Sequence, residues 1–420
     1  MKRKLFFWAK KKINSENIRF VVLLIPMIII LIQNIATDGL DLSSLLDTNI
    51  LISFMLVALC DVIAHMLLNV IQKKCEDESK LDTKYSDLVS KYSLNNLIEY
   101  QGDKFPVVCQ HLRKRDISWK IEINDDPENR YELPSQVADL SGEIMEAHSQ
   151  SVVYNQIYVR LNDTSWNQDT SILTFYTGRT FYYDSLLTNR AADYKLSNGK
   201  TIREIYEPGP YIQSLQQTKM SNHLGFNGFL EMNDGKIPFV VRGDNVSIGK
   251  GTLANSIGAA MKSKYAIEYE HDYRFTCNGL GNAILKEIVD ELALCPANQA
   301  NEYFQEHGIT SSDAVNSIFA IYRDLVECGK PQFLFFMKFD FLSSEELQKI
   351  FNSKNKEKII KKEDKVKRDG KKLIFFTLEQ LKSAKITADK LKITMNGAEY
   401  SYTMMPSASA SIVMLLEYLK

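Results

Sequence analysis

Three acidic residues at helical spacing are the first candidates for chemistry in this sequence. Asp290 and Glu291 follow Glu287 by three and four positions within the segment 279–294. Residues at these spacings share one face of a helix, so the three carboxylates would repel one another. A hard cation offsets this repulsion, since Mg²⁺ binds a few carboxylates together with phosphate oxygens. The alternative is a solvated acidic face on an amphipathic helix, which the spacing alone favours.

The segments around this helix predict an α/β domain over residues 215–420. The strand-forming runs 224–232 and 237–242 flank Asn233-Asp234-Gly235, a sequence that predicts a hairpin turn. A Gly-rich loop over residues 246–262 comes next, and its glycines would allow the backbone to approach a ligand closely. Strands that alternate with helices are typical of an α/β sandwich.

The acidic segment resembles part of the Nudix box, G-x5-E-x7-R-E-U-x-E-E-x-G-U, where U is bulky and apolar. Residues 286–294, KEIVDELAL, follow its second half, and the order of the surrounding elements is also similar. The resemblance covers residues 215–420 and implies a Nudix-like α/β/α sandwich. It also implies that Glu287, Asp290 and Glu291 are the residues that would hold Mg²⁺, the candidate cofactor, against a nucleotide pyrophosphate.

The box is incomplete. Lys286 stands at the position of the Arg, Ala293 at that of the Gly, Asn278 at that of the first Glu, and Asp272 at that of the leading Gly. We therefore expect nucleotide binding rather than hydrolysis, and we assign no residue to catalysis. A hydrolase of a nucleoside diphosphate derivative remains the alternative.

The same resemblance implies a ligand pocket between the Gly-rich loop, the box helix and the strand after it. Arg242, Lys250 and Arg323 are the candidates for binding phosphate, because guanidinium and ammonium groups supply fixed positive charge. Phe226 or Phe229 is the candidate for stacking on a base. The alternatives are that Arg323 pairs with a neighbouring carboxylate and that one phenylalanine belongs to the core.

Two apolar segments near the N-terminus predict a transmembrane hairpin. Residues 20–36 carry no charge, and residues 49–71 contain Asp61 and His65. Both segments are long enough to cross a bilayer as helices. Basic flanks and an acidic connection predict a multi-pass membrane protein with both termini cytoplasmic. Asp61 and His65 share a helix face, where they would line a pore, drive helix association or hydrogen-bond locally.

The predicted domains are the hairpin (1–74), a helical stalk (75–96), an α+β region (97–214) and the Nudix-like domain (215–420). This combination resembles the SMODS-associated Nudix-domain proteins of CBASS-type antiphage defence. The resemblance implies an effector in the bacterial inner membrane that senses a cyclic oligonucleotide, forms homo-oligomers and disrupts the lipid bilayer. It also implies a functional link to a CD-NTase-type nucleotidyltransferase. A structural anchor that recruits a partner protein is a further alternative.

The composition agrees with a globular chain rather than a disordered one. Of 420 residues, 51 are Lys or Arg and 52 are Asp or Glu, so no basic excess indicates binding to a DNA or RNA polymer. The six cysteines contain no CxxC pair, which argues against a zinc ribbon or a disulfide scaffold.

Overall fold

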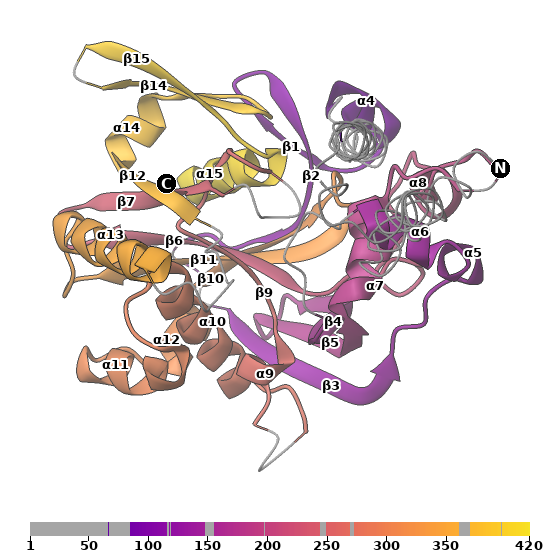
Figure 1. The fold of residues 1–420 in the computed structure, drawn as a ribbon, viewed down its shortest axis with the longest axis horizontal. Helices are drawn as coiled ribbons and strands as arrows, with labels where there is room; N and C mark the ends of the chain where they lie inside the picture. The colour runs from indigo at the N-terminus through magenta and orange to yellow at the C-terminus, as the bar shows by residue number, and fades with distance from the viewer. Residues whose placement is uncertain are drawn as a thin grey trace, which may run out of the picture. The chain divides into compact units, whose positions relative to one another are not determined.

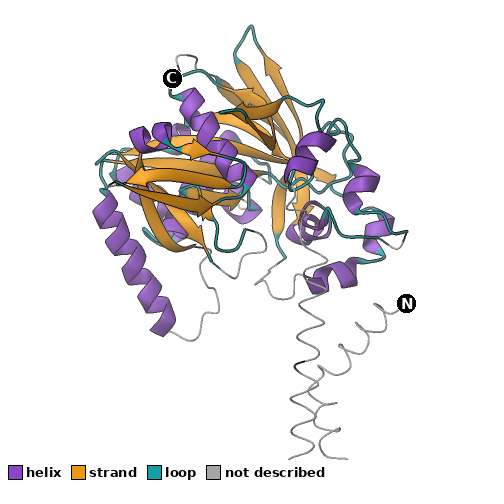
Figure 2. Ribbon diagram, turned by 90° about the horizontal axis from the view of Figure 1, so that it is seen from above, coloured by secondary structure: helices purple, strands orange, loops and turns teal. Residues whose placement is uncertain are grey.

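The computed structural model describes residues 85–115, 117, 119–147, 155–196, 198–243, 249–268, 273–360, 370–395 and 397–420, together with Met66. Apart from Met66, these residues belong to a single unit, Ser79–Lys420. The unit is an α/β structure in which four sheets lie among short and medium helices (Figure 1; Figure 2).

A six-stranded sheet forms the centre of this unit. Its strand order is β1 (Leu97–Tyr100), β2 (Asp103–Leu112), β10 (Ile318–Asp324), β11 (Lys330–Phe339), β6 (Gly225–Met232) and β9 (Ile257–Ala260). Neighbouring strands are antiparallel except β11 and β6, which are parallel. The sheet thus combines strands from both sides of position 214.

The central strands are buried on both faces, as their continuous apolar sequences require. Towards one face, Phe226 of β6 stacks on Phe333 of β11, with ring centroids 5.1 Å apart and planes 8° from parallel. Towards the other, Phe229 and Leu334 join a second core cluster. Each face therefore needs its own helical cover.

Two helices provide much of this cover. Helix α10 (Cys277–Leu292) begins where the Thr276 hydroxyl accepts a hydrogen bond from the Gly279 amide, and it ends at Ala293, whose φ is +61°. Its apolar residues share one core with Phe226 and Phe333. Helix α15 (Pro406–Tyr418) packs into the other core, and Pro406 at its first turn is compatible with a helix start.

Three smaller sheets surround the central one. Their strands, in spatial order, are β12 (Gly370–Thr377), β7 (Lys236–Arg242) and β8 (Leu253–Ala254); β13 (Lys385–Ile386), β14 (Lys390–Met395) and β15 (Ala398–Thr403); and β3 (Lys120–Arg130), β5 (Ile172–Phe181) and β4 (Ile157–Asn167). The predicted turn at Gly235 forms with φ of +72°, but it does not close a hairpin, because β6 and β7 belong to different sheets.

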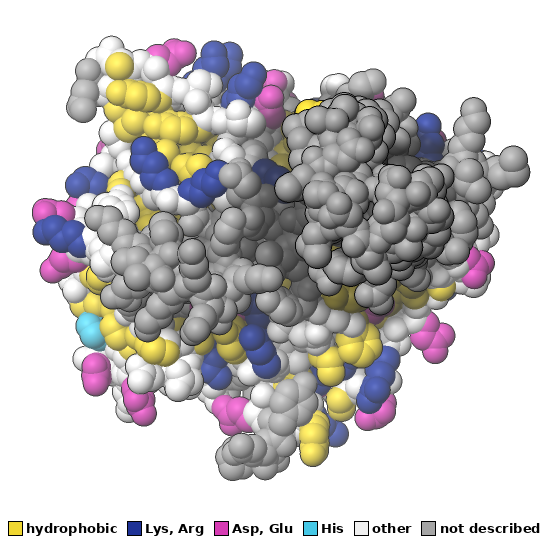
Figure 3. Space-filling view, in the orientation of Figure 1, with side chains coloured by type: hydrophobic (Ala, Val, Ile, Leu, Met, Phe, Trp, Pro, Cys, Tyr) yellow, Lys and Arg dark blue, Asp and Glu magenta, His cyan; other side chains and the backbone are white. Residues whose placement is uncertain are grey.

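The remaining helices are short, with one exception, α13. They are α4 (Tyr85–Lys91), α5 (Ser135–Ala138), α6 (Ser141–Ala147), α7 (Tyr182–Leu187), α8 (Ile202–Tyr206), α9 (Ser263–Ala266), α11 (Ala300–Glu306), α12 (Ser311–Asn316), α13 (Ser344–Ile360) and α14 (Leu378–Ser383), with 3₁₀ turns at Asn189–Ala191 and Ala297–Gln299. Basic and acidic side chains are interspersed over the visible described surface (Figure 3).

The predictions of a membrane-anchored fold and of an inner-membrane location are corrected by this structure. Within the described ranges, no helix is both long and apolar enough to cross a bilayer. The longest of them, α13 with 17 residues, has the charged sequence SEELQKIFNSKNKEKII, and α10 with 16 residues contains charged side chains as well. The segment 20–36, and the segment 49–71 except Met66, lie outside the described residues, as do Asp61 and His65.

Gly228 provides a test of the central strand pair. A Cβ atom built on Gly228 would lie 2.0 Å from Cζ of Phe335, a fully buried ring on the neighbouring strand. We expect Gly228→Ala to lower the free energy of unfolding by about 1–3 kcal/mol, since overpacking displaces the ring or the strand. Urea denaturation of the full chain measures this change.

Gly142 of α6 is the matched control, because a Cβ atom there meets nothing within 4 Å. Gly142→Ala should be neutral or stabilising by up to about 1 kcal/mol. Equal stabilities of the two variants would contradict the close approach of β6 and β11.

Candidate functional site

The three acidic residues of α10 do not share one environment. Glu287 is 1% exposed and forms an ion pair with Lys262, whose Nζ lies 2.7 Å from Oε1 and 2.9 Å from Oε2. Asp290 is exposed, and Glu291 is half-buried. Lys262 is held in place by the Tyr265 ring, whose centroid lies 5.2 Å from Nζ.

The charge of Glu287 is neutralised inside the protein. Burial raises the pKa of Glu287, and Lys262 opposes this rise by stabilising the carboxylate. Burial acts to lower the pKa of Lys262, but the paired carboxylate outweighs it, so the pKa of Lys262 is raised. The two side chains form a buried carboxylate–ammonium pair.

This arrangement does not fit a magnesium site. The most buried carboxylate of α10 has an ammonium group where a metal ion would have to lie. Among the residues that the structure describes, no group of three or more His, Cys, Asp and Glu side chains could hold a metal ion. We derive no metal-dependent step from this helix.

Two of the predicted ligand-binding residues lie inside the protein. Phe226 is fully buried against Phe333, and Phe229 is likewise buried, against Phe239. Arg323 is 2% exposed and donates hydrogen bonds to the carbonyls of Gly329 and Gln213. Burial lowers the pKa of Arg323 to about 10. The guanidinium thus fixes two backbone segments.

The other two predicted ligand-binding residues, Arg242 and Lys250, lie at the end of β7 and in the segment that follows it. Arg242 is half-buried at the end of β7, and its carbonyl accepts a hydrogen bond from the Gly251 amide. Lys250 is exposed between Gly249 and Gly251, which have φ of +66° and +71°. Arg242 and Lys250 are thus partly or fully open to solvent, whereas Phe226 and Arg323 are buried.

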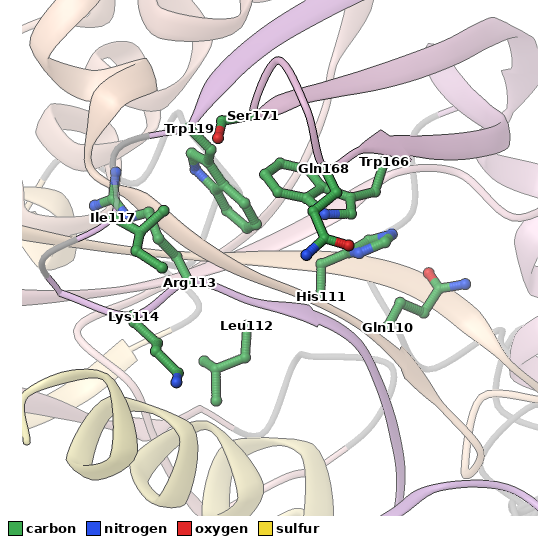
Figure 4. A pocket seen from close by; sticks show the side chains of 10 residues that line it. All are labelled: Gln110, His111, Leu112, Arg113, Lys114, Ile117, Trp119, Trp166, Gln168 and Ser171. Atoms are coloured by element: carbon green, nitrogen blue, oxygen red, sulfur yellow. The ribbon is translucent and has the colours of Figure 1, made fainter.

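A cavity that the sequence did not reveal opens beside the end of β2. Its volume is about 550 Å³. Strand β2, the segment after it, the end of β4 and the β4–β5 turn contribute its ten lining residues (Figure 4): Gln110, His111, Leu112, Arg113, Lys114, Ile117, Trp119, Trp166, Gln168 and Ser171.

Strand pairing positions Trp166 in this cavity, and a side-chain hydrogen bond positions Trp119. Trp166 lies opposite Leu173 in the β4–β5 ladder. Trp119 precedes β3, and its indole Nε1 donates a hydrogen bond to the Ile318 carbonyl at the start of β10, at 2.9 Å. The rings of Trp119 and Trp166 have centroids 6.0 Å apart and planes inclined at 60°. Trp119 is 7% exposed and Trp166 is 36% exposed, so one indole is a fixed wall and the other is accessible.

Polar and charged groups complete the lining. The His111 ring lies 6.4 Å from Trp166, and burial lowers the pKa of His111, so its imidazole is neutral at neutral pH. The Arg113 guanidinium lies over Trp119, 5.9 Å from the ring centroid. Lys114 is exposed beside it. The cavity therefore combines aromatic faces with positive charge and side-chain amides.

None of the ten lining residues was a candidate from the sequence. One signal was available, since Trp119 and Trp166 are two of only three tryptophans in the chain. They are 47 positions apart, however, and nothing in their local sequence indicates that the β4–β5 turn folds back towards the segment after β2.

Comparisons with known proteins give no guide to the site. No protein-family model matches the sequence, and no curated protein matches it.

The Glu287–Lys262 pair generates a stability prediction. Lys262→Met leaves a buried carboxylate without its partner, and we expect the free energy of unfolding to fall by about 3–5 kcal/mol. The pKa of Glu287 in the folded state then rises further above its unfolded value. An acid with a raised folded-state pKa loses stability as pH increases, so the deficit should be larger at about pH 8 than at about pH 5.

Chemical denaturation at the two pH values measures this effect. Lys264→Met is the matched control, because Lys264 is an exposed lysine two positions away that also lies beside the Tyr265 ring. The double variant Lys262→Met/Glu287→Leu should recover most of the loss, since it removes both charges. A Lys262→Met deficit that does not depend on pH would contradict the proposed charge pairing.

Proposed function

We propose that this protein is a nucleotide receptor that binds its ligand without hydrolysing it, in the cavity between β2, Trp119 and the β4–β5 turn. The observation that carries the proposal is the lining itself, in which two indoles lie beside Arg113 and Lys114. Aromatic side chains stack on nucleobases, and basic side chains bind phosphates.

The size and polarity of the cavity support this ligand class. About 550 Å³ lies within the 300–1,000 Å³ range typical of small-molecule sites. Gln110, Gln168 and Ser171 add the few polar groups that fix the orientation of a base. An apolar metabolite would not use these groups, and a simple anion would not use the two indoles.

Binding without hydrolysis is supported by the state of α10. Glu287 is paired with Lys262, so the most buried of the three carboxylates of α10 is not open to the metal ion that a metal-dependent hydrolase needs. This contact counts against the alternative of a nucleoside diphosphate hydrolase.

A cyclic oligonucleotide is the ligand that we propose, on the strength of the resemblance of the chain's domain combination to SMODS-associated Nudix-domain proteins; the cavity itself is lined by residues before position 215. One nucleotide unit of such a ring would enter the cavity, with its base against Trp166 and its phosphate towards Arg113. This assignment makes the protein a sensor of a messenger produced by a nucleotidyltransferase.

Tryptophan fluorescence and calorimetry test the proposal on the full chain. In a Trp8→Phe background only Trp119 and Trp166 emit, so cyclic diadenosine monophosphate or AMP should quench the emission saturably. Trp166→Ala should weaken binding by roughly fivefold to a hundredfold in isothermal titration calorimetry, since one stacked base contributes about 1–3 kcal/mol.

Tyr176→Ala is the matched control. Tyr176 lies on the adjacent strand β5, is 36% exposed like Trp166, and does not line the cavity. Its substitution should leave the affinity unchanged. Absence of saturable quenching by any nucleotide, or equal binding by Trp166→Ala and the parent, would refute the proposal.

A further inference from the structure

His223 is a titratable side chain that is enclosed by the protein. Its exposed fraction is 0%, and neither ring nitrogen has a hydrogen-bond partner among the described residues. The ring centroid lies 5.3 Å from that of Tyr158 and 6.1 Å from that of Tyr182. This site suits a neutral imidazole, because an imidazolium would be a buried charge with two N–H donors and no acceptor.

The charges around His223 also oppose its protonation. The groups that surround the ring are Tyr158 and Arg160 of β4, Tyr182 of α7, Arg190 of the 3₁₀ turn Asn189–Ala191 and Lys330 of β11. Burial lowers the pKa of His223 well below its usual value, and the positive charges of Lys330 and Arg190 lower it further. Both cations share one carboxylate, that of Glu327, at 3.4 Å and 3.2 Å. Protonation of His223 would place a further positive charge beside them.

His223 lies at the contact between the central sheet and a helical layer. This helical layer consists of α5, α6, α7, the 3₁₀ turn Asn189–Ala191 and α8, which lie together on one side of the unit (Figure 1). Apolar side chains of these elements form a small core of their own, which Cys328 of the β10–β11 turn joins. A part of a protein that has its own core can open from the rest without global unfolding.

Polar contacts join the helical layer to the β10–β11 turn. Arg203 of α8 donates hydrogen bonds to the carbonyls of Leu325 and Val326, at 2.6 Å and 2.8 Å. Asn189 donates another to the Glu327 carbonyl, at 2.9 Å. Water can replace such hydrogen bonds when the layer opens, so opening costs less than the separation of two apolar surfaces would.

We propose that His223 is a proton sensor, and that its protonation opens the helical layer from the β10–β11 turn so that water reaches the imidazolium. Histidine suits this role because its unperturbed pKa lies just below neutral pH. The inference does not rest on the nucleotide cavity or on the proposed function.

Proton linkage sets the pH window of the opening. In the open state His223 has the ordinary pKa of histidine, about 6.5, whereas in the closed state its pKa is lowered. The closed state therefore loses stability as pH falls below about 6.5, and the opening equilibrium constant rises about tenfold by about pH 5.5. Asp324 acts in the opposite direction where it is exposed on opening, because burial raises its pKa. The effect of His223 is therefore measured as a difference between proteins that share Asp324.

Hydrogen exchange of the full chain, read by mass spectrometry at about pH 7.5 and about pH 5.5, tests the proposal. After correction for intrinsic exchange rates, peptides from residues 182–206 should lose about tenfold more protection in the parent than in His223→Phe. Phenylalanine retains a ring beside Tyr158 and Tyr182 but binds no proton. Peptides from β6 should stay protected in both proteins, which distinguishes local opening from global unfolding.

His307→Phe is the matched control, because His307 is an exposed histidine at the end of α11. It should respond to pH as the parent does. If His223→Phe does not fold, His223→Gln is the second variant that cannot titrate in this range. An equal pH response of residues 182–206 in the parent and in the His223 variant would overturn the proposal. Loss of protection in β6 together with residues 182–206 would overturn it as well, since the protein would then unfold as a whole.

Discussion

The parallel pairing of β6 with β11 is the contact on which the rest of the architecture depends. It joins segments about 100 positions apart over eight residue pairs, from Gly225–Gln332 to Met232–Phe339. Gly228 allows the Phe335 ring to lie directly against the backbone of β6. The paired strands present one apolar face to α10 and the other to α15. Because β10 pairs with β11, the same contact also places the Ile318 carbonyl that fixes Trp119.

Buried ion pairs connect further segments to this frame. Asp125 of β3 binds Arg179 of β5 through two hydrogen bonds of 2.7 Å and also accepts one from the Phe275 amide just before α10. Glu287 of α10 is bound in the same way to Lys262 after β9. Each pair satisfies a charge that would be costly if left alone, and so each fixes the position of two or three distant segments.

The Glu287–Lys262 pair is the reason that we place the proposed ligand in the cavity rather than at α10. A carboxylate that already has a cationic partner cannot bind a metal ion without losing that partner. The Trp119–Trp166 cavity has aromatic faces beside a guanidinium, and we propose it as the site of nucleotide binding.

The sequence by itself determined the local features of this protein. The helical spacing of the acidic residues in segment 279–294 predicted the helix that the structure has at Cys277–Leu292, and Asn233-Asp234-Gly235 predicted the turn between β6 and β7. Both depend on neighbours within a few positions, where spacing and backbone conformation are decisive. The strand-and-helix pattern likewise predicted an α/β structure, although its membrane-anchored form was wrong for the described residues.

Only the tertiary structure decided which segments meet. The turn at Gly235 does not reveal that β6 pairs with β11 instead of β7. An arginine such as Arg323 looks the same in sequence whether it meets a phosphate or two backbone carbonyls. The partner of Glu287 and the approach of Trp119 to Trp166 depend on contacts between residues 25 and 47 positions apart. Such contacts arise from the shared burial of whole elements, which no local pattern records.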